Sequence, residues 1–158
     1  MTGKVKPIPE GYHSVTPYLI IKGAADAIEF YKKAFGAIEL FRMAQPGGKI
    51  GHAEIKIGDS PIMLADEFPE MKYVGPKTLG GSPVSLMIYV KDVDNVFNQA
   101  IAAGGEQQKP LQDQFYGDRS GTLKDPFGHV WHIATHKEDV TPEEMHKRAA
   151  AAAGGSQG

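Results

Sequence analysis

Three side chains of this 158-residue sequence combine types and spacing that could support acid–base or metal chemistry. His52 and Glu54 stand two positions apart in a β-type run, so on a strand they share one face, ~7 Å apart along the chain. His132 lies in a later β-type run. If it meets the other two, the set could hold a divalent cation or act as an acid–base group. Otherwise the three side chains form a polar rim that orients a ligand.

A second group of histidines resembles a metal motif only in its spacing. His129, His132 and His136 are close in sequence, but strand alternation places His129 on the face opposite the other two. We therefore interpret this cluster as accidental. The sequence contains no cysteine, so any metal would need donors from His, Asp, Glu or Gln.

The elements that position these residues occur twice. A β-type run at 16–21 leads into an amphipathic helix at 24–36, and a run at 85–90 leads in the same way into a helix at 93–101. The two copies are 69 residues apart, and three short β-type segments follow each helix. They lie at 38–43, 50–57 and 61–65 after the first helix, and at 106–111, 121–124 and 129–135 after the second. The sequence predicts an α+β fold of two tandem βαβββ modules. These would form a cupped, partly open mixed sheet with the helices on its outer face.

Composition shifts and turn residues divide the chain. We expect an N-terminal tail at 1–12, a first module at 13–66, a Gly- and Pro-rich linker at 67–83, a second module at 84–137, and a C-terminal helix with a disordered tail at 138–158. The whole would be one domain.

Strand alternation also predicts which side chains face the cup. The predicted ligand-binding wall contains Thr16, Tyr18, His52, Glu54, Met63, Ser85, Met87, Tyr89 and His132. Arg119, at the entrance to the second module, could bind an anionic group through a bidentate contact, or form a surface ion pair with Asp118. Such a mixed wall with few titratable groups suits an organic ligand.

Several segments together resemble the vicinal oxygen chelate superfamily, which contains glyoxalase I, bleomycin-resistance proteins, fosfomycin-resistance transferases and extradiol dioxygenases. These segments are Ala27-Ile28-Glu29-Phe30-Tyr31, Phe35-Gly36-Ala37, His52-Ala53-Glu54, Ile62-Met63-Leu64-Ala65-Asp66 and Asp125-Pro126-Phe127-Gly128-His129-Val130-Trp131. The resemblance covers about Ser14 to His136 and is nearest to the PhnB-like branch.

The resemblance implies where a metal would bind. Metal-dependent members carry ligands at positions that fall here on Thr16, Met63, Ser85 and His132. Only His132 is a good ligand, because divalent cations need several imidazole or carboxylate donors. The expected function is therefore that of a bleomycin-resistance-like protein, which binds a small organic molecule between the modules without the standard metal site and without cofactor. The alternative is a divalent-metal-dependent lyase, isomerase or dioxygenase that uses a displaced site of His52, Glu54 and His132.

Charge and hydropathy limit the partners. The formal net charge is −2, with 17 basic and 19 acidic residues that do not cluster, which argues against nucleic acid. No apolar run reaches the roughly 18 residues of a membrane span, and residues 1–11 lack the pattern of a signal peptide. We expect a cytoplasmic protein without a membrane partner. By analogy with the family, we also expect a homodimer.

Overall fold

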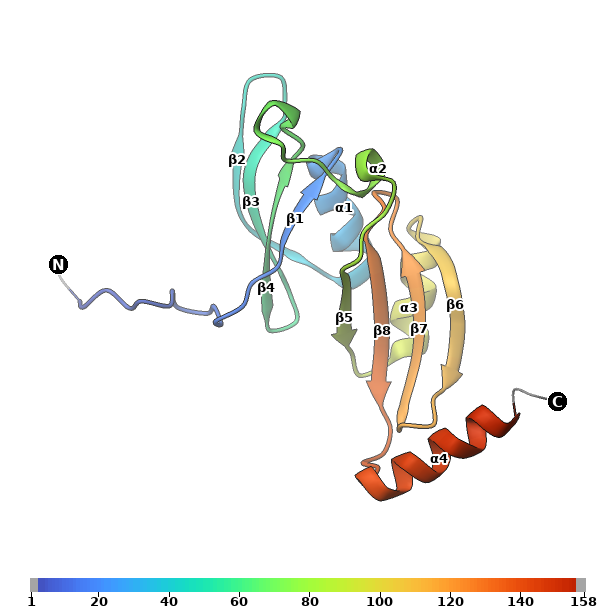
Figure 1. Cartoon of the computed structure of the whole chain (residues 1–158). Helices are drawn as coiled ribbons and strands as arrows, with labels where there is room; N and C mark the ends of the chain where they lie inside the picture. Colours follow the sequence, from blue (N-terminus) through green and yellow to red (C-terminus); the bar gives the residue numbers. More distant parts are fainter. Residues whose placement is uncertain (1–2, 156–158) are drawn as a thin grey trace. The chain divides into compact units, whose positions relative to one another are not determined.

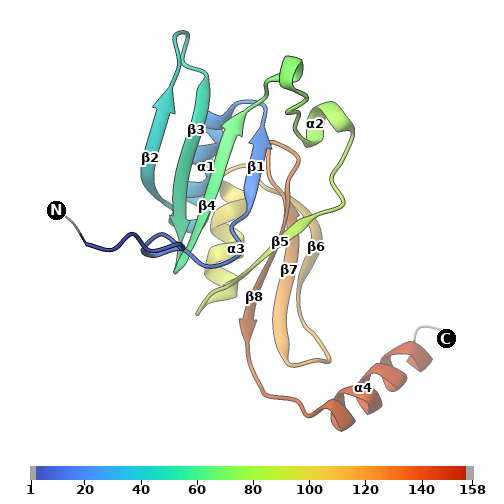
Figure 2. The same ribbon diagram turned by 60° about the vertical axis from the view of Figure 1, so that its left-hand side comes forward.

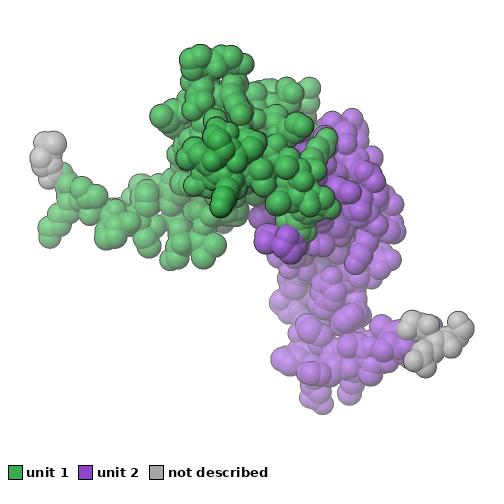
Figure 3. All heavy atoms as spheres, turned by 45° about the horizontal axis from the view of Figure 1, so that its top comes forward, with its two compact units in different colours: residues 1–82 green, residues 83–158 purple. Residues whose placement is uncertain are grey.

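The computed structural model describes residues 3–155 and contains two four-stranded mixed sheets (Figure 1). Each sheet belongs to its own compact unit, and the division falls between Ser82 and Pro83 (Figure 3). No helix within the described residues is long and apolar enough to cross a membrane.

The first unit contains β1 (Tyr18–Ile21), α1 (Ala24–Phe35), β2 (Ile38–Ala44), β3 (Ile50–Ile57), β4 (Ser60–Asp66), the 3-10 helix η1 (Pro69–Met71) and α2 (Pro76–Leu79). The second unit contains β5 (Ser85–Tyr89), α3 (Val93–Ala102), β6 (Glu106–Asp113), β7 (Asp118–Lys124), β8 (Val130–His136) and α4 (Pro142–Gly155).

The two sheets share one topology. Their strand orders are β1-β4-β3-β2 and β5-β8-β7-β6. In the first sheet β1 pairs in parallel with β4, and in the second β5 pairs in parallel with β8. The other neighbours are antiparallel. Within each unit the long helix covers one face of its own sheet, as Figure 2 shows for α1 behind the first sheet. The predicted α+β fold of two βαβββ modules is confirmed.

Amphipathic spacing explains why the helices form and pack. In α1, Ile28, Tyr31 and Ala34 recur at helical spacing and are fully buried. Leu64 on β4 is a fully buried residue of the same core. The helix ends at Gly36, which adopts the left-handed conformation that glycine tolerates best (φ 69°).

The second unit is organised around a buried tryptophan. Trp131 is completely buried, and its indole N–H donates to Asp125 Oδ2 at 2.9 Å. On the neighbouring strand, Gly121 leaves room for the ring of Phe97 on α3. A Cβ atom at Gly121 would lie 2.7 Å from that ring, so this position requires glycine.

One polar side chain at the end of each sheet's last strand connects it to its helix. The Oδ1 atom of Asp66 accepts hydrogen bonds from the backbone N–H groups of Gly23 and Ala24, at 3.0 and 2.9 Å. Its Oδ2 atom accepts the N–H of Ile50 at 2.6 Å. Asp66 thereby caps α1 and anchors the start of β3.

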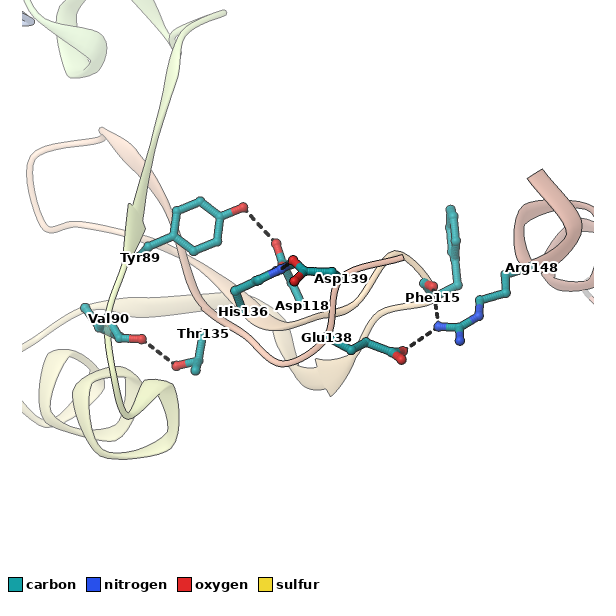
Figure 4. Close-up of polar contacts among 9 residues, drawn as sticks. All are labelled: Tyr89, Val90, Phe115, Asp118, Thr135, His136, Glu138, Asp139 and Arg148. Atoms are coloured by element: carbon teal, nitrogen blue, oxygen red, sulfur yellow. Dashed lines mark hydrogen bonds and ion pairs between the residues drawn. The ribbon is translucent and has the colours of Figure 1, made fainter. Parts of the chain in front are cut away.

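Thr135 occupies the equivalent place in the second unit. Its Oγ1 atom accepts the N–H of Val93, the first residue of α3, at 2.9 Å, and it donates to the carbonyl oxygen of Val90 at 2.7 Å (Figure 4). Asp92 adds a cap by accepting the N–H of Asn95.

Three segments differ from the expectation in detail. Strand β7 begins at Asp118, three residues before the predicted start at Gly121, because the turn at Gly117 reverses the chain immediately before it. Within the expected linker lie η1 and α2. Helix α4 continues to Gly155, and the remainder of the expected disordered tail, residues 156–158, lies outside the described residues, as do residues 1–2.

Buried carboxylate contacts join the end of β8 to neighbouring strands (Figure 4). Asp118 is buried and accepts hydrogen bonds from Tyr89 Oη at 2.8 Å and from His136 Nδ1 at 2.7 Å. The other ring nitrogen of His136 lies 2.8 Å from Asp139 Oδ1. An ionised carboxylate can only accept, so both contacts favour a proton on the ring nitrogen that faces them. These contacts raise the pKa of His136, with Asp118 the larger cause.

Asp66→Ala should destabilise the protein strongly. The substitution leaves three backbone N–H groups without their acceptor, which predicts a loss of about 3 kcal/mol in unfolding free energy. Urea unfolding followed by circular dichroism measures this. Asp59→Ala, at an exposed turn, is the matched control and should cost less than about 0.5 kcal/mol. Equal losses in the two variants would contradict the capping role.

The stability that His136 contributes should depend on pH. Its folded-state pKa is raised, so the stabilisation is fully present below the ordinary value of 6.5 and is lost as pH rises through the raised value. His136→Gln cannot become charged. The difference in melting temperature between the parent and this variant should therefore be largest at acidic pH and shrink towards alkaline pH. If the difference in melting temperature instead grows as pH rises, the contribution of His136 to stability does not depend on its protonated form.

Candidate functional site

The open face of the first sheet, opposite α1, brings together four predicted site residues. Tyr18 on β1 stands opposite Met63 on β4, which in turn stands opposite Glu54 on β3. His52 lies two residues before Glu54 on the same strand. These four side chains alternate with buried neighbours such as Leu64, as the strand pattern predicted.

A chain of hydrogen bonds connects the polar members of this group. Tyr18 Oη lies 2.7 Å from His52 Nδ1, and His52 Nε2 lies 3.1 Å from Glu54 Oε2. The other oxygen of Glu54 accepts a hydrogen bond from Tyr12. Burial raises the pKa of the Tyr18 phenol, and the nearby Tyr73 contributes to the increase.

Tyr18 also lines a pocket of about 820 Å³ that lies entirely within the first unit. Ile20 and Ala65, from the adjacent parallel strands β1 and β4, line it as well. The segment from Phe68 to Tyr73 contributes four more lining residues.

Backbone and side-chain contacts hold that segment in place. Phe68 and Tyr73 form an isolated antiparallel bridge around η1. Glu67 accepts hydrogen bonds from the N–H of Gly75 and from Thr78 Oγ1, both at 2.6 Å, and these contacts lower the pKa of the Glu67 carboxyl. Lys49 Nζ lies 4.4 Å from the centre of the Phe68 ring. The pocket wall therefore has defined supports.

The open face of the second sheet brings together three other predicted residues. His132 stands opposite Met87 on β5 and opposite Thr122 on β7. Its Nδ1 atom lies 2.8 Å from Thr122 Oγ1, and its Nε2 atom lies 3.0 Å from Ser85 Oγ. Met87, Thr122 and His132 line a smaller pocket of about 440 Å³, together with Lys109.

The remaining predicted residues lie apart from these two groups. Tyr89 donates to the buried Asp118, which raises the pKa of its phenol. Thr16 precedes β1 and is half-buried.

Arg119 does not reach the open face. It alternates with Ser120 on β7 and binds Asp94 on α3 through two hydrogen bonds, Nε to Oδ2 at 2.9 Å and Nη2 to Oδ1 at 2.8 Å. A third contact reaches Asp113 at 3.3 Å. Its ion-pair partners are therefore Asp94 and Asp113 rather than Asp118, and the hydrogen bonds from Arg119 lower the pKa of Asp94.

The donor set does not fit a divalent cation. At the four positions implied by the family resemblance, the first unit supplies Thr16 and Met63, and the second supplies Ser85 and His132. Two neutral hydroxyls, a thioether and one imidazole are a poor set for such an ion. Among the described residues, no three His, Asp or Glu side chains gather in a way that could hold a metal. Of the alternative set, His52 and Glu54 lie in the first unit and His132 in the second.

Sequence reasoning missed several residues around these sites. Tyr12 was placed in a tail, yet it binds Glu54. Phe68 and Tyr73 were placed in a linker, and their aromatic character in a Gly- and Pro-rich segment was the only local signal of a packing role. Thr122 was not identified as a partner of His132 because that pairing depends on strand register.

Comparisons with known proteins agree with this architecture. The family model for the Glyoxalase/Bleomycin resistance protein/Dioxygenase superfamily matches residues 12–133. An uncharacterised protein of Mycobacterium tuberculosis (strain ATCC 25618 / H37Rv) is 42% identical over 135 residues, covering 84% of this chain and 79% of that protein.

Solved structures show the same fold. TioX from Micromonospora sp. ML1 is 27% identical with a TM-score of 0.61, and the match covers 82% of this chain and all (100%) of TioX. A PhnB protein from Bacillus cereus, described as a putative 3-demethylubiquinone-9 3-methyltransferase, is 21% identical with a TM-score of 0.63, covering 78% and 99% of the two chains. The duplicated βαβββ sheets and the family match together place this chain in the glyoxalase/bleomycin resistance protein/dioxygenase superfamily.

Proposed function

We propose that this protein binds a small organic molecule in the pocket on the open face of its first sheet, without a metal in the standard position. The observation that carries the proposal is the pocket of about 820 Å³ beside Tyr18. Pockets of roughly 300–1,000 Å³ are typical of sites for drug-sized ligands.

The lining favours a ligand with a substantial apolar surface. Aromatic rings from Tyr18, Phe68 and Tyr73 and the thioether of Met71 offer apolar and polarisable contacts. Without a ligand these side chains face water, since Tyr18, Met71 and Tyr73 are 49%, 62% and 50% exposed. A ligand would remove much of this apolar surface from water.

The polar groups of the lining would orient rather than drive binding. Asp66 already satisfies three backbone N–H groups, so its carboxylate serves the fold. Gln45, Glu70 and Tyr18 also line the pocket. A few placed polar groups around an apolar cavity are the usual arrangement of a small-molecule site.

Membership in a superfamily whose name includes bleomycin-resistance proteins supports a binding role. The weak metal donors at Thr16, Met63 and Ser85 argue in the same direction, because the metal-dependent chemistry of the superfamily needs stronger ligands at these places.

Filling the pocket should weaken ligand binding. Ala65 lines the pocket floor, and Ala65→Leu adds three carbon atoms there. A library of small aromatic compounds, screened by two-dimensional NMR, should give ligands that shift the amide signals of Ile20, Ala65 and Tyr73. Ala65→Leu should raise the Kd of these ligands at least tenfold, which corresponds to about 1.4 kcal/mol of binding free energy.

Ala151→Leu, on the exposed surface of α4, is the matched control and should leave binding unchanged. Ligands that bind equally to both variants, or stoichiometric divalent metal in protein purified without chelator, would contradict the proposal.

We also propose a homodimer, on family analogy and on the apolar side chains that the open faces expose. Phe41 and Met43 on β2 are 47% and 57% exposed, and Met87 on β5 is 45% exposed. Such side chains in water favour a covering partner. Light scattering at micromolar concentration should give twice the mass of the 158-residue chain, and a monomeric mass would overturn this proposal.

A further inference from the structure

The hydrogen-bond chain at Tyr18 has a defined direction. Glu54 receives two hydrogen bonds, one from Tyr12 and one from His52 Nε2, so its carboxylate acts only as an acceptor. The ring proton of a neutral His52 therefore resides on Nε2. Its Nδ1 atom, 2.7 Å from Tyr18 Oη, presents a lone pair to the phenol proton.

This order of groups is the one that activates side-chain nucleophiles. A hydroxyl donates to an imidazole nitrogen, and a carboxylate orients the imidazole through its other nitrogen. Here the hydroxyl is the phenol of Tyr18, and this same residue lines the pocket of about 820 Å³. The side chain of Tyr18 is therefore part of the wall of that space.

We propose that Tyr18 is a chemically active residue, with His52 as the base that takes its proton and Glu54 as the positioning residue of His52. As the phenol oxygen attacks the electrophilic atom of a sulfonyl- or acyl-type compound that carries a leaving group, its proton moves to His52 Nδ1. The resulting imidazolium remains bound to Glu54, and the leaving group departs with its electron pair. This base-assisted nucleophilic substitution needs no metal and goes beyond ligand binding.

The need for a base follows from the surroundings of Tyr18. Burial and the neighbouring Tyr73 raise the pKa of the phenol, so it is protonated at neutral pH. A protonated phenol is a poor nucleophile. His52 supplies the acceptor that an unassisted tyrosine would lack.

Tyr89 provides an internal control of similar accessibility. It is 62% exposed, against 49% for Tyr18, but its hydroxyl donates to the carboxylate of Asp118. An aspartate carboxylate is a weaker base than an imidazole by about 2.6 pKa units in their ordinary values. Tyr89 should therefore remain inert under conditions in which Tyr18 reacts.

The test uses benzenesulfonyl fluoride on the full-length protein at neutral pH. A sulfur–oxygen bond forms at the tyrosine, fluoride leaves with the electron pair of the sulfur–fluorine bond, and the phenol proton passes to His52. Peptide mapping by mass spectrometry should find Tyr18 labelled at least about tenfold faster than Tyr89. His52→Gln should reduce the rate at Tyr18 to that at Tyr89, and Glu54→Gln should reduce it in part. Equal labelling of the two tyrosines in the parent protein would overturn the proposal.

Rescue by a diffusible base separates chemistry from structure. In His52→Ala, added imidazole can occupy the vacated space and accept the proton, so it should restore labelling at Tyr18 and leave Tyr89 unchanged. If His52→Ala keeps a native circular dichroism spectrum and added imidazole does not raise its rate of labelling at Tyr18, the role of His52 as base is contradicted. Benzenesulfonyl fluoride reacts with the tyrosine directly, so the test does not depend on the ligand of the pocket. Its failure would leave the binding proposal intact, because Ala65→Leu tests that proposal separately.

Discussion

The rest of each unit depends on one polar side chain at the end of its last strand. In the first unit Asp66 accepts the N–H groups that open α1 and also the N–H of Ile50 at the start of β3. A buried helix terminus without partners would be costly, and a carboxylate at this point also complements the positive end of the helix. One side chain thereby locks helix, parallel strand pair and antiparallel strand together, and it holds the open face in a constant register.

In the second unit a hydroxyl group, rather than a carboxylate, caps the start of the helix. Thr135 lies 69 residues after Asp66, and it binds the N–H of Val93, which lies 69 residues after Ala24. The cap is thus retained at equivalent places although its chemistry differs. Both copies therefore combine the same strand order with a polar side chain that caps the first helix.

The open faces have diverged where no such constraint acts. Tyr18 and Met63 stand in register in the first sheet, and Met87 and His132 occupy the equivalent pair in the second. The first face carries an imidazole beside a pocket wall with aromatic rings, whereas on the second His132 binds two hydroxyls. The first unit therefore offers the larger of these two pockets and links a phenol, an imidazole and a carboxylate by hydrogen bonds, which is why the proposals for binding and for proton transfer both centre on Tyr18.

The sequence by itself determined the duplicated βαβββ plan and the alternation of faces. These follow from local periodicity, such as Ile28 and Tyr31 on one side of a helix, and from turn residues such as Gly36. Only the tertiary structure decided which polar groups meet. Tyr12 reaches Glu54 across 42 positions, and Arg119 reaches Asp94 across 25. Such pairs depend on strand register and on the path of loops, and neither leaves a periodic trace in the sequence.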